Sequence, residues 1–183
     1  MSDELVSMVR NANPNREQQN VSRRLLKVLE ELGETSEACL SVSSPDNYKS
    51  KNWEDYREEA VDTLIVLIDI ALTPGNLSPG QALISPVIRA AKIHSVESLD
   101  ELYDEKFVIA GAVSATALHL KENDTMGALG ALMRGITAAA NMCFAQIPSD
   151  ADASKTIELQ VRDIFAKKID KWNTNQRQFS EGV

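Results

Sequence analysis

Residues 58–72 read EEAVDTLIVLIDIAL, and this stretch decides the fold. Nearly every position after Asp62 is apolar, so the segment has no polar face to turn toward water. A helix that is apolar all round is buried on every side. The run is still shorter than the roughly 18 to 20 uninterrupted apolar residues that a membrane span requires. It therefore predicts the central helix of a bundle, enclosed by other helices.

Turn and capping signals on both sides of this stretch divide the chain into further helices. Asn13 followed by Pro14 is typical of an N-cap and a first turn, and Ser98 with Glu101 matches a capping box. Thr125 is expected to cap the next helix, and the tail from Gln176 is expected to fray. The six predicted helices cover 14–42, 52–72, 78–91, 98–123, 125–147 and 153–173.

No segment shows the sustained polar and apolar alternation of a strand, so the predicted class is all-α. The 183 residues suit one domain, 1–183, with a four-helix-type core and extra helices. The composition, 43% hydrophobic and 25% charged, is that of a globular protein. A net charge of −8 argues against binding to a nucleic acid polymer, although a metal-filled pocket can still hold a single nucleotide.

The N-terminus and the cysteines bear on location. Residues 1–4 lack a basic segment followed by an apolar run, so no secretory signal is expected. Cys39 and Cys143 lie within helical patterns and lack metal-site or redox spacing, which is typical of packed, reduced thiols. These features predict a cytoplasmic protein without a membrane segment.

Two aspartates interrupt the apolar stretch on one face, Asp62 and Asp69, seven residues apart. An unpaired buried carboxylate costs several kcal/mol, a large part of a domain's roughly 5–15 kcal/mol of stability. Because the chain is acidic, we expect a divalent cation to compensate them rather than two buried Lys or Arg side chains. The alternative is an Asp bonded to a neighbouring helix or facing a subunit contact.

A second acidic group lies on the preceding helix, where residues 27–37 read KVLEELGETSE. At about 100° per residue, Lys27, Glu30, Glu34 and Glu37 fall within an arc of about 80°, with Glu31 beside them. Taken alone, this is typical of a solvated helix face. However, the pairs Glu31/Glu34 and Glu59/Asp62 both have the i, i+3 spacing of neighbours on a helix surface. If the two helices pack antiparallel, both pairs can converge on one cation.

The paired motif resembles that of the all-α nucleoside triphosphate pyrophosphohydrolases, the MazG-like and dimeric dUTPase superfamily. Its E-E-x-x-E half is similar to residues 30–34, and its E-x-x-D half to residues 59–62, with 24 residues between them. The resemblance covers about Arg16 to Leu72. It implies Mg²⁺-dependent cleavage of a nucleoside triphosphate to a monophosphate and pyrophosphate, in nucleotide housecleaning or dUTP control. It also implies a homodimer or homotetramer.

Residue roles follow from the same resemblance. Mg²⁺, with Mn²⁺ as a substitute, would be held by Glu31, Glu34, Glu59 and Asp62. Catalytic roles would fall to Glu30 or Glu34, as the proton acceptor, and to Lys27, as a phosphate contact. The final helix is similar to the family's nucleotide-facing segment, and its substrate-binding candidates are Lys168, Lys171, Trp172, Asn173 and Arg177.

The middle of the chain departs from the family pattern. Residues 107–145 are rich in Ala and Gly, and Ala110, Gly111, Ser114 and Ala117 can be laid over Glu30, Glu31, Glu34 and Glu37. A degenerate internal copy, an insertion and chance similarity all remain open. A di-iron carboxylate bundle is excluded because neither His94 nor His119 follows a Glu by three positions. No Gly-rich phosphate loop is present. The competing function is a non-catalytic helical interaction module that retains an acidic metal-binding face.

Overall fold

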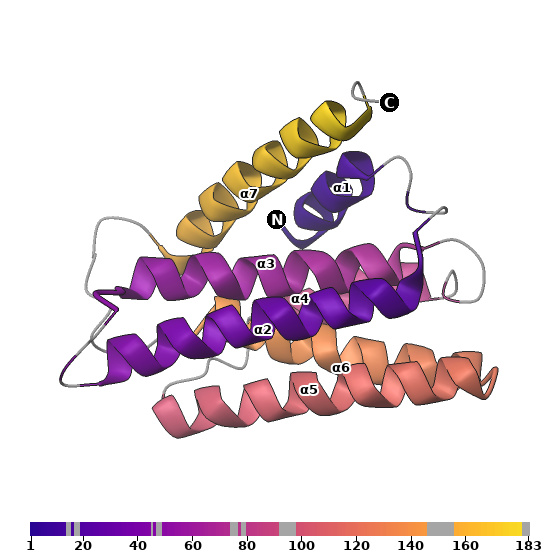
Figure 1. Cartoon of the computed structure of the whole chain (residues 1–183), viewed down its shortest axis with the longest axis horizontal. Coiled ribbons are helices and arrows are strands. Elements are labelled where there is room, and N and C mark those ends of the chain that lie inside the picture. The colour runs from indigo at the N-terminus through magenta and orange to yellow at the C-terminus, as the bar shows by residue number, and fades with distance from the viewer. Residues whose placement is uncertain are drawn as a thin grey trace.

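The computed structural model describes residues 1–13, 16, 19–44, 46, 49–73, 77, 80–91, 98–145 and 156–180, with the backbone alone for 175–180. Every regular element in these ranges is a helix, so the all-α prediction is confirmed (Figure 1). None of the described helices is both long and apolar enough to cross a membrane.

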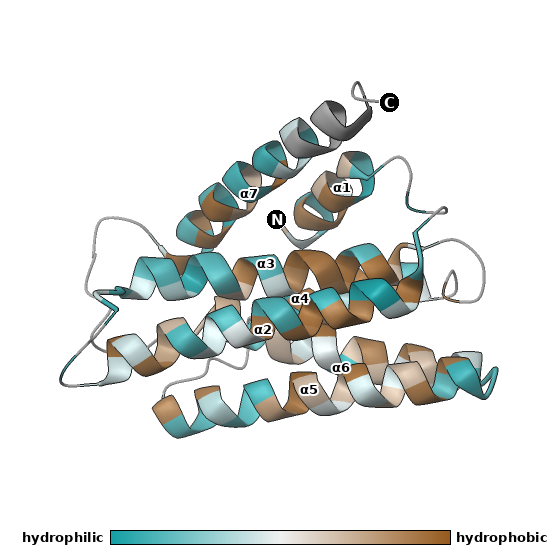
Figure 2. Ribbon diagram, viewed as in Figure 1, coloured by the Kyte–Doolittle hydropathy of each residue, from teal (hydrophilic) through white to brown (hydrophobic). Residues whose placement is uncertain are grey.

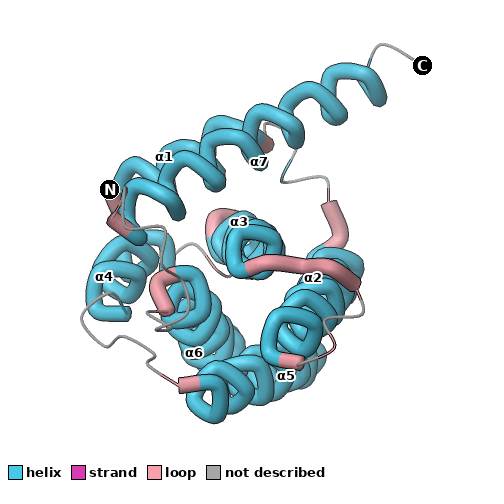
Figure 3. The backbone as a smooth tube through the Cα atoms, turned by 90° about the vertical axis from the view of Figure 1, so that its left-hand side faces the viewer, coloured by secondary structure: helices cyan, strands magenta, loops and turns pink. Residues whose placement is uncertain are grey.

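The core is a four-helix bundle of two antiparallel hairpins. The first consists of α2 (Val21–Ser43) and α3 (Trp53–Ala71), and the second of α5 (Leu99–Lys121) and α6 (Thr125–Cys143). The hairpins pack through α2 against α5 and through α3 against α6. The view along the bundle places α3 inside a ring of other helices (Figure 3). Every residue from Thr63 to Ala71 is buried, as the apolar run predicts.

Three further helices cover the bundle. α1 (Ser2–Ala12) and α7 (Ile157–Ser180) lie on the outer side of α3, and α4 (Gln81–Ala91) packs against α6 and α1. Apolar residues are concentrated in the C-terminal half of α3, while its N-terminal half, α2 and α7 carry more polar residues (Figure 2). The cover formed by α7 is important for the site because it brings basic side chains close to the acidic ones of α2 and α3.

Several predicted helix ends are wrong. α2 begins at Val21, not at 14, because the Asn20 side chain accepts bonds from the amides of Ser22 and Arg23. The helix before it, α1, was not expected at all, and Pro14 lies outside the described residues. Asp124, not Thr125, caps α6, which ends at Cys143. α7 remains helical to Ser180, beyond the predicted end at 173 and into the tail expected to fray.

The capping boxes at Ser98 and Asn52 define the starts of α5 and α3. As a result, the two hairpins have matching dimensions: α2 and α5 each contain 23 residues, and α3 and α6 each contain 19. Aligning the helix starts pairs Gly33 with Gly111, a shift of two positions from the alignment proposed from sequence. The positions of the four motif carboxylates are then taken by Ile109, Ala112, Ala131 and Arg134.

Candidate metal centre and adjoining pocket

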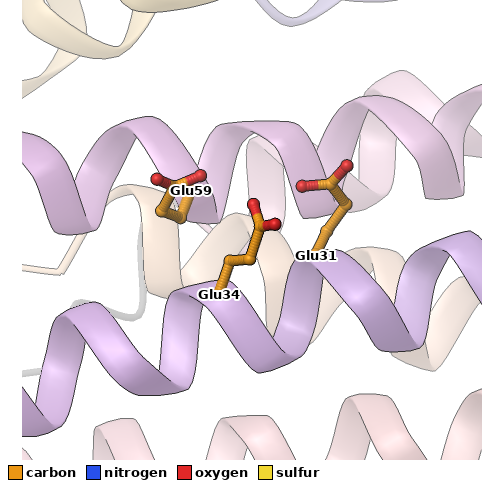
Figure 4. Close-up of side chains that lie close together, drawn as sticks. All are labelled: Glu31, Glu34 and Glu59. Carbon is orange, nitrogen blue, oxygen red and sulfur yellow. The ribbon is translucent and has the colours of Figure 1, made fainter.

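Three carboxylates converge between the facing sides of α2 and α3. Glu31 and Glu34 come from α2, and Glu59 comes from α3 (Figure 4). One oxygen from each lies within 4.8 Å of an oxygen of the other two. Glu31 is buried, Glu59 is partly buried and Glu34 is exposed at the edge. The antiparallel hairpin thus brings together three of the four predicted ligands, and we call them the acidic cluster.

Two lysines flank the acidic cluster: the Lys27 ammonium lies 2.8 Å from Oε1 of Glu31, and the Lys51 ammonium lies 3.8 Å from Oε1 of Glu59. Burial raises the pKa of Glu31, and the charges of Asp62 and Glu34 raise it further against the opposing effect of Lys27. Burial likewise raises the pKa of Glu59, with Lys168 opposing and Asp62 and Glu34 adding to the effect. Removing both carboxylates from water while they repel one another favours either a bound proton or a cation. Three hard oxygen ligands at this separation fit a divalent cation such as Mg²⁺.

Asp62, the fourth predicted ligand, is bonded to a cation of the protein itself. The Lys168 ammonium on α7 donates to Oδ2 of Asp62 at 2.5 Å and lies 3.5 Å from Oε2 of Glu58. Burial raises the pKa of Asp62 in spite of this bond. Asp62 is close enough to influence Glu31 and Glu59 electrostatically, but it does not share the 4.8 Å grouping. The predicted set of four ligands is therefore not assembled.

Lys27 closes one side of the acidic cluster. Its ammonium lies 2.9 Å from Oε1 of Glu30 and 2.8 Å from Oε1 of Glu31. Partial burial disfavours the charged form, but the bonds from Glu31 and Glu30 outweigh it and raise the pKa of Lys27 above its ordinary value. Lys27 is thus a permanent cation beside the cluster, and Glu30 is held next to it instead of pointing at the other carboxylates.

The expectation that a divalent cation compensates Asp69 is wrong. Asp69 accepts hydrogen bonds from Nε of Arg16 at 2.6 Å, from Nη1 of Arg24 at 2.8 Å and from Nδ2 of Asn13 at 3.1 Å. All four side chains are buried. Two guanidinium groups therefore neutralise this carboxylate in a structural network that ties the end of α1 and the start of α2 to α3.

A cavity of about 970 Å³ adjoins the acidic cluster on the α7 side. Residues of α2, α3 and α7 line it, including Glu31 and Asp62 from the site described above. Its walls combine charged, amide and apolar side chains. The cationic ones are Arg23, Arg24, Lys27, Lys168 and Lys171, the acidic ones are Glu30, Glu31, Asp62 and Asp69, the amides are Gln19 and Asn20, and the apolar ones are Leu26, Ile65, Val66 and Trp172. The mixed lining can hold a ligand that has a flat apolar end and an anionic end accompanied by a cation.

The C-terminal substrate-binding candidates differ in position. Lys168, Lys171 and Trp172 line the cavity, whereas Asn173 is partly buried outside the lining set. The side chain of Arg177 lies outside the described residues. Sequence reasoning missed Arg23, although it precedes Lys27 by one helical turn, a spacing that places both on one side of α2.

Comparisons of the chain with protein-family models, with curated proteins and with solved structures return no match. The chemistry of the site therefore has to be inferred from its own residues and from the motif that they form.

Proposed function

We propose that this protein is a Mg²⁺-dependent hydrolase that cleaves nucleoside triphosphates into a monophosphate and pyrophosphate. The observation that carries the proposal is the acidic cluster at the edge of a cation-lined cavity of about 970 Å³. The E-E-x-x-E and E-x-x-D pattern supports it, because three of its five carboxylates, Glu31, Glu34 and Glu59, converge. Although the net charge of the chain is −8, five Lys and Arg side chains line this cavity beside four carboxylates.

The acidic cluster fits a divalent cation for two reasons. Its donors are hard oxygens. In addition, burial and the charges of neighbouring carboxylates raise the pKa of Glu31 and Glu59, and a bound cation would relieve both effects. Glu31, Glu34 and Glu59 would hold Mg²⁺ or Mn²⁺, and Asp62 would join them when Lys168 moves away. When bound, the cation would neutralise phosphate charge and lower the pKa of a water molecule.

The chain's own cations would bind the triphosphate. Lys27 and Lys168 lie beside the acidic cluster, and Lys171 is one turn further along α7. They can balance the charge that grows on the leaving pyrophosphate. Asn173 and Arg177, at the end of the same helix, remain candidates for contacts with the distal part of the substrate. Trp172 offers a stacking surface for the base, with Ile65 and Val66 as the apolar floor.

A carboxylate of α2 would accept the proton from the attacking water. Two candidates were predicted, Glu30 and Glu34. Glu30 is bonded to Lys27, which makes it less available as a proton acceptor. Glu34 is an exposed member of the acidic cluster. The geometry supports Glu34 as the proton acceptor and Glu30 as the residue that holds Lys27 in place.

A nucleotide panel with Mg²⁺ tests the proposal. We expect a monophosphate and pyrophosphate in equal amounts, whereas diphosphate and inorganic phosphate would contradict the cleavage position. Glu34→Gln should lower kcat by at least about 100-fold, a typical loss for a general base. The matched control is Glu37→Gln, one turn along α2, since Glu37 bonds Lys49 at 2.7 Å and lies outside the acidic cluster. Equal activity of both variants would refute the assignment.

The competing function, a non-catalytic interaction module that retains an acidic metal-binding face, predicts no turnover of any nucleotide. A module without the metal site should melt at the same temperature with and without Mg²⁺, whereas a ligand that binds only the folded state raises the melting temperature. A shift with Mg²⁺ but no turnover of any nucleotide would favour a metal-binding module over the hydrolase.

A further inference from the structure

The cavity extends along α2 well beyond the acidic cluster. The α2 side chains that line it begin with the N-cap, Asn20, and continue through Arg23 to Glu31. Arg23 and Glu31 are eight residues apart, which corresponds to about 12 Å along a helix. Helical side chains lean toward the N-terminus of their helix, so both lean the same way and the separation is kept. A chain of three phosphates is shorter than this, so a triphosphate held at the acidic cluster leaves the start of α2 unfilled.

Positive charge is in surplus at the start of α2. The carboxylate of Asp69 is shared between the guanidinium groups of Arg16 and Arg24, and these three groups together leave one positive charge. Arg23 adds a second. Within the described part of the chain, the Arg23 guanidinium has neither an ion-pair nor a hydrogen-bond partner. We call Asn20, Arg23 and Arg24 the arginine end of the cavity.

Arg24 has a donor that the described residues leave unsatisfied. Its side chain is buried, and it donates from Nη1 to Oδ2 of Asp69 at 2.8 Å and from Nη2 to Oγ1 of Thr73 at 2.6 Å. The Nε–H of Arg24 is also buried, but no acceptor among the described residues pairs with it. A buried donor without an acceptor is destabilising. Because Arg24 lines the cavity, an oxygen of a ligand bound there would supply the missing acceptor.

The backbone at the start of α2 also favours an anion. Oδ1 of Asn20 accepts hydrogen bonds from the amides of Ser22 and Arg23, which leaves its Nδ2 as a donor. The N-terminal end of a helix carries a partial positive charge, which attracts anions and repels cations. α2 nevertheless has arginines at its third and fourth residues and no acid in its first turn. An anion bound here would offset the repulsion between the helix dipole and the two guanidinium groups.

We propose that the arginine end binds a second phosphate group, carried on the sugar of the substrate, and that Arg23 is the residue that selects for it. The 5′-triphosphate then lies at the acidic cluster and the base on Trp172, so this subsite rests on the proposed function. A phosphate on the 2′ or 3′ oxygen is separated from the triphosphate by the sugar, which provides the reach that the triphosphate lacks.

The chemistry of a phosphate monoester matches the arginine end. Its charge of about −1.5 to −2 at pH 7 balances the two surplus positive charges. The guanidinium of Arg23 can donate two parallel hydrogen bonds to its oxygens, and Nε of Arg24 and Nδ2 of Asn20 are further donors. The preferred substrate class is therefore a nucleoside 5′-triphosphate that also carries a 2′- or 3′-phosphate.

Isothermal titration calorimetry with nucleotides that are not cleaved tests the subsite directly. The probes are a nucleoside 5′-monophosphate and the 2′,5′- and 3′,5′-bisphosphates of the same nucleoside, for each common base, with Mg²⁺ present. We expect one bisphosphate to bind at least about 10-fold more tightly than the monophosphate, the gain of a charge-assisted hydrogen bond. The bisphosphate that gains shows which sugar oxygen carries the phosphate. The absence of a gain with either bisphosphate of any base would overturn the proposal.

Three variants assign the gain to the arginine end. Arg23→Gln should abolish it and leave the affinity for the monophosphate unchanged, and circular dichroism should show an intact fold because Arg23 is exposed. Arg134→Gln is the matched control, since Arg134 is exposed on α6 and does not line the cavity. It should keep the full gain. Lys27→Gln, beside the acidic cluster, should weaken the monophosphate and the bisphosphate alike. A gain that survives in Arg23→Gln would overturn the role of Arg23.

Turnover separates this subsite from the proposed function. The kcat/KM of the triphosphate with a sugar phosphate should exceed that of the unmodified triphosphate by at least about 10-fold, and Arg23→Gln should make the two equal. Equal values in the native protein would overturn the second subsite and leave the hydrolase standing. An Arg23-dependent gain in binding without cleavage of any triphosphate would support the subsite and refute the hydrolase.

Discussion

The ammonium of Lys168 on α7 lies 2.5 Å from Oδ2 of Asp62 on α3. A lysine thus neutralises the one predicted metal ligand that is not part of the acidic cluster. The same bond fastens α7, which carries Lys171 and Trp172 into the cavity, to the helix that carries Glu59. The proposed metal and the proposed substrate would both weaken this bond, each through a different partner. A cation would compete for Asp62, and a phosphate would compete for Lys168.

Lys168→Met should separate these two roles. Without metal, Asp62 loses its cation in a largely buried position, so the variant should melt at a lower temperature than the native protein. Mg²⁺ should then raise its melting temperature by more than it raises that of the native protein, because Asp62 is free to join Glu31, Glu34 and Glu59. Thermal melting with Mg²⁺ and with EDTA measures both effects.

The control for this variant is Lys167→Met. Lys167 is exposed and bonds Glu58 at 2.6 Å. Its removal should change the melting temperature by no more than a few degrees, and it should leave the effect of Mg²⁺ unchanged. If Lys168→Met gains no more from Mg²⁺ than the native protein, Asp62 does not participate in metal binding.

Glu59 should make the stability of the metal-free protein depend on pH. Its pKa is raised in the folded state, chiefly by burial, above the ordinary value of 4.5. The folded state therefore holds this proton at pH values where the unfolded chain has lost it. The stabilising contribution is full below about pH 4.5 and is lost as pH rises through the raised pKa.

A difference measurement isolates this contribution from those of other carboxylates, such as Glu58, whose lowered pKa has the opposite effect. In EDTA, Glu59→Gln should melt above the native protein at pH 7, and the gap should close as the pH falls toward 4. Mg²⁺ at pH 7 should reverse the order, because only the native protein has the complete acidic cluster. A gap that widens on acidification would contradict the assigned direction of the pKa shift.

The sequence predicts the hairpin but not all of the charge pairing within it. Periodicity and capping residues locate α2 and α3, and the i, i+3 spacing correctly places Glu31 and Glu34 opposite Glu59. These are local properties of a helix surface. The partners of Asp69 are not local: Arg16 is 53 residues away, in the segment between α1 and α2. No spacing rule connects an isolated arginine in a connecting segment with a position on a distant helix.

The position of α7 illustrates the same limit. Its basic residues could be identified as candidates from sequence, but only the packing of α7 against α3 shows that Lys168 contacts Asp62 and that Asn173 is outside the cavity. The second hairpin could not be aligned with the first from sequence either. α5 and α6 carry none of the four predicted metal ligands that would fix the register, and aligning the helix starts shifts the pairing by two positions.

Asp69→Asn should destabilise the whole protein without altering the metal site. Removing the charge leaves the guanidinium groups of Arg16 and Arg24 buried without their counter-ion. Breaking a buried ion pair in this way costs about 3–5 kcal/mol. Urea denaturation should show this loss in the free energy of unfolding, whereas Asp170→Asn, at an exposed position on α7, should stay within about 0.5 kcal/mol of the native protein. The Mg²⁺-dependent shift of the melting temperature should persist in Asp69→Asn as long as this variant remains folded. Loss of that shift in the folded variant would show that the Asp69 network is connected to the metal site.

Trp172 should report substrate binding through its fluorescence. The chain has two tryptophans, and the other, Trp53, lies edge-to-face on Tyr56 with ring centroids 5.6 Å apart, outside the cavity. Trp53→Phe therefore leaves Trp172 as the sole indole, and its emission should change when a nucleotide is added without metal. Trp172→Phe should show no such change.

Because stacking of a base on an aromatic ring is worth about 1–3 kcal/mol, Trp172→Leu should raise KM by about 10-fold or more and change kcat less. A response of Trp53 alone, or a KM unchanged in Trp172→Leu, would place the base elsewhere and leave only the phosphates in the cationic part of the cavity.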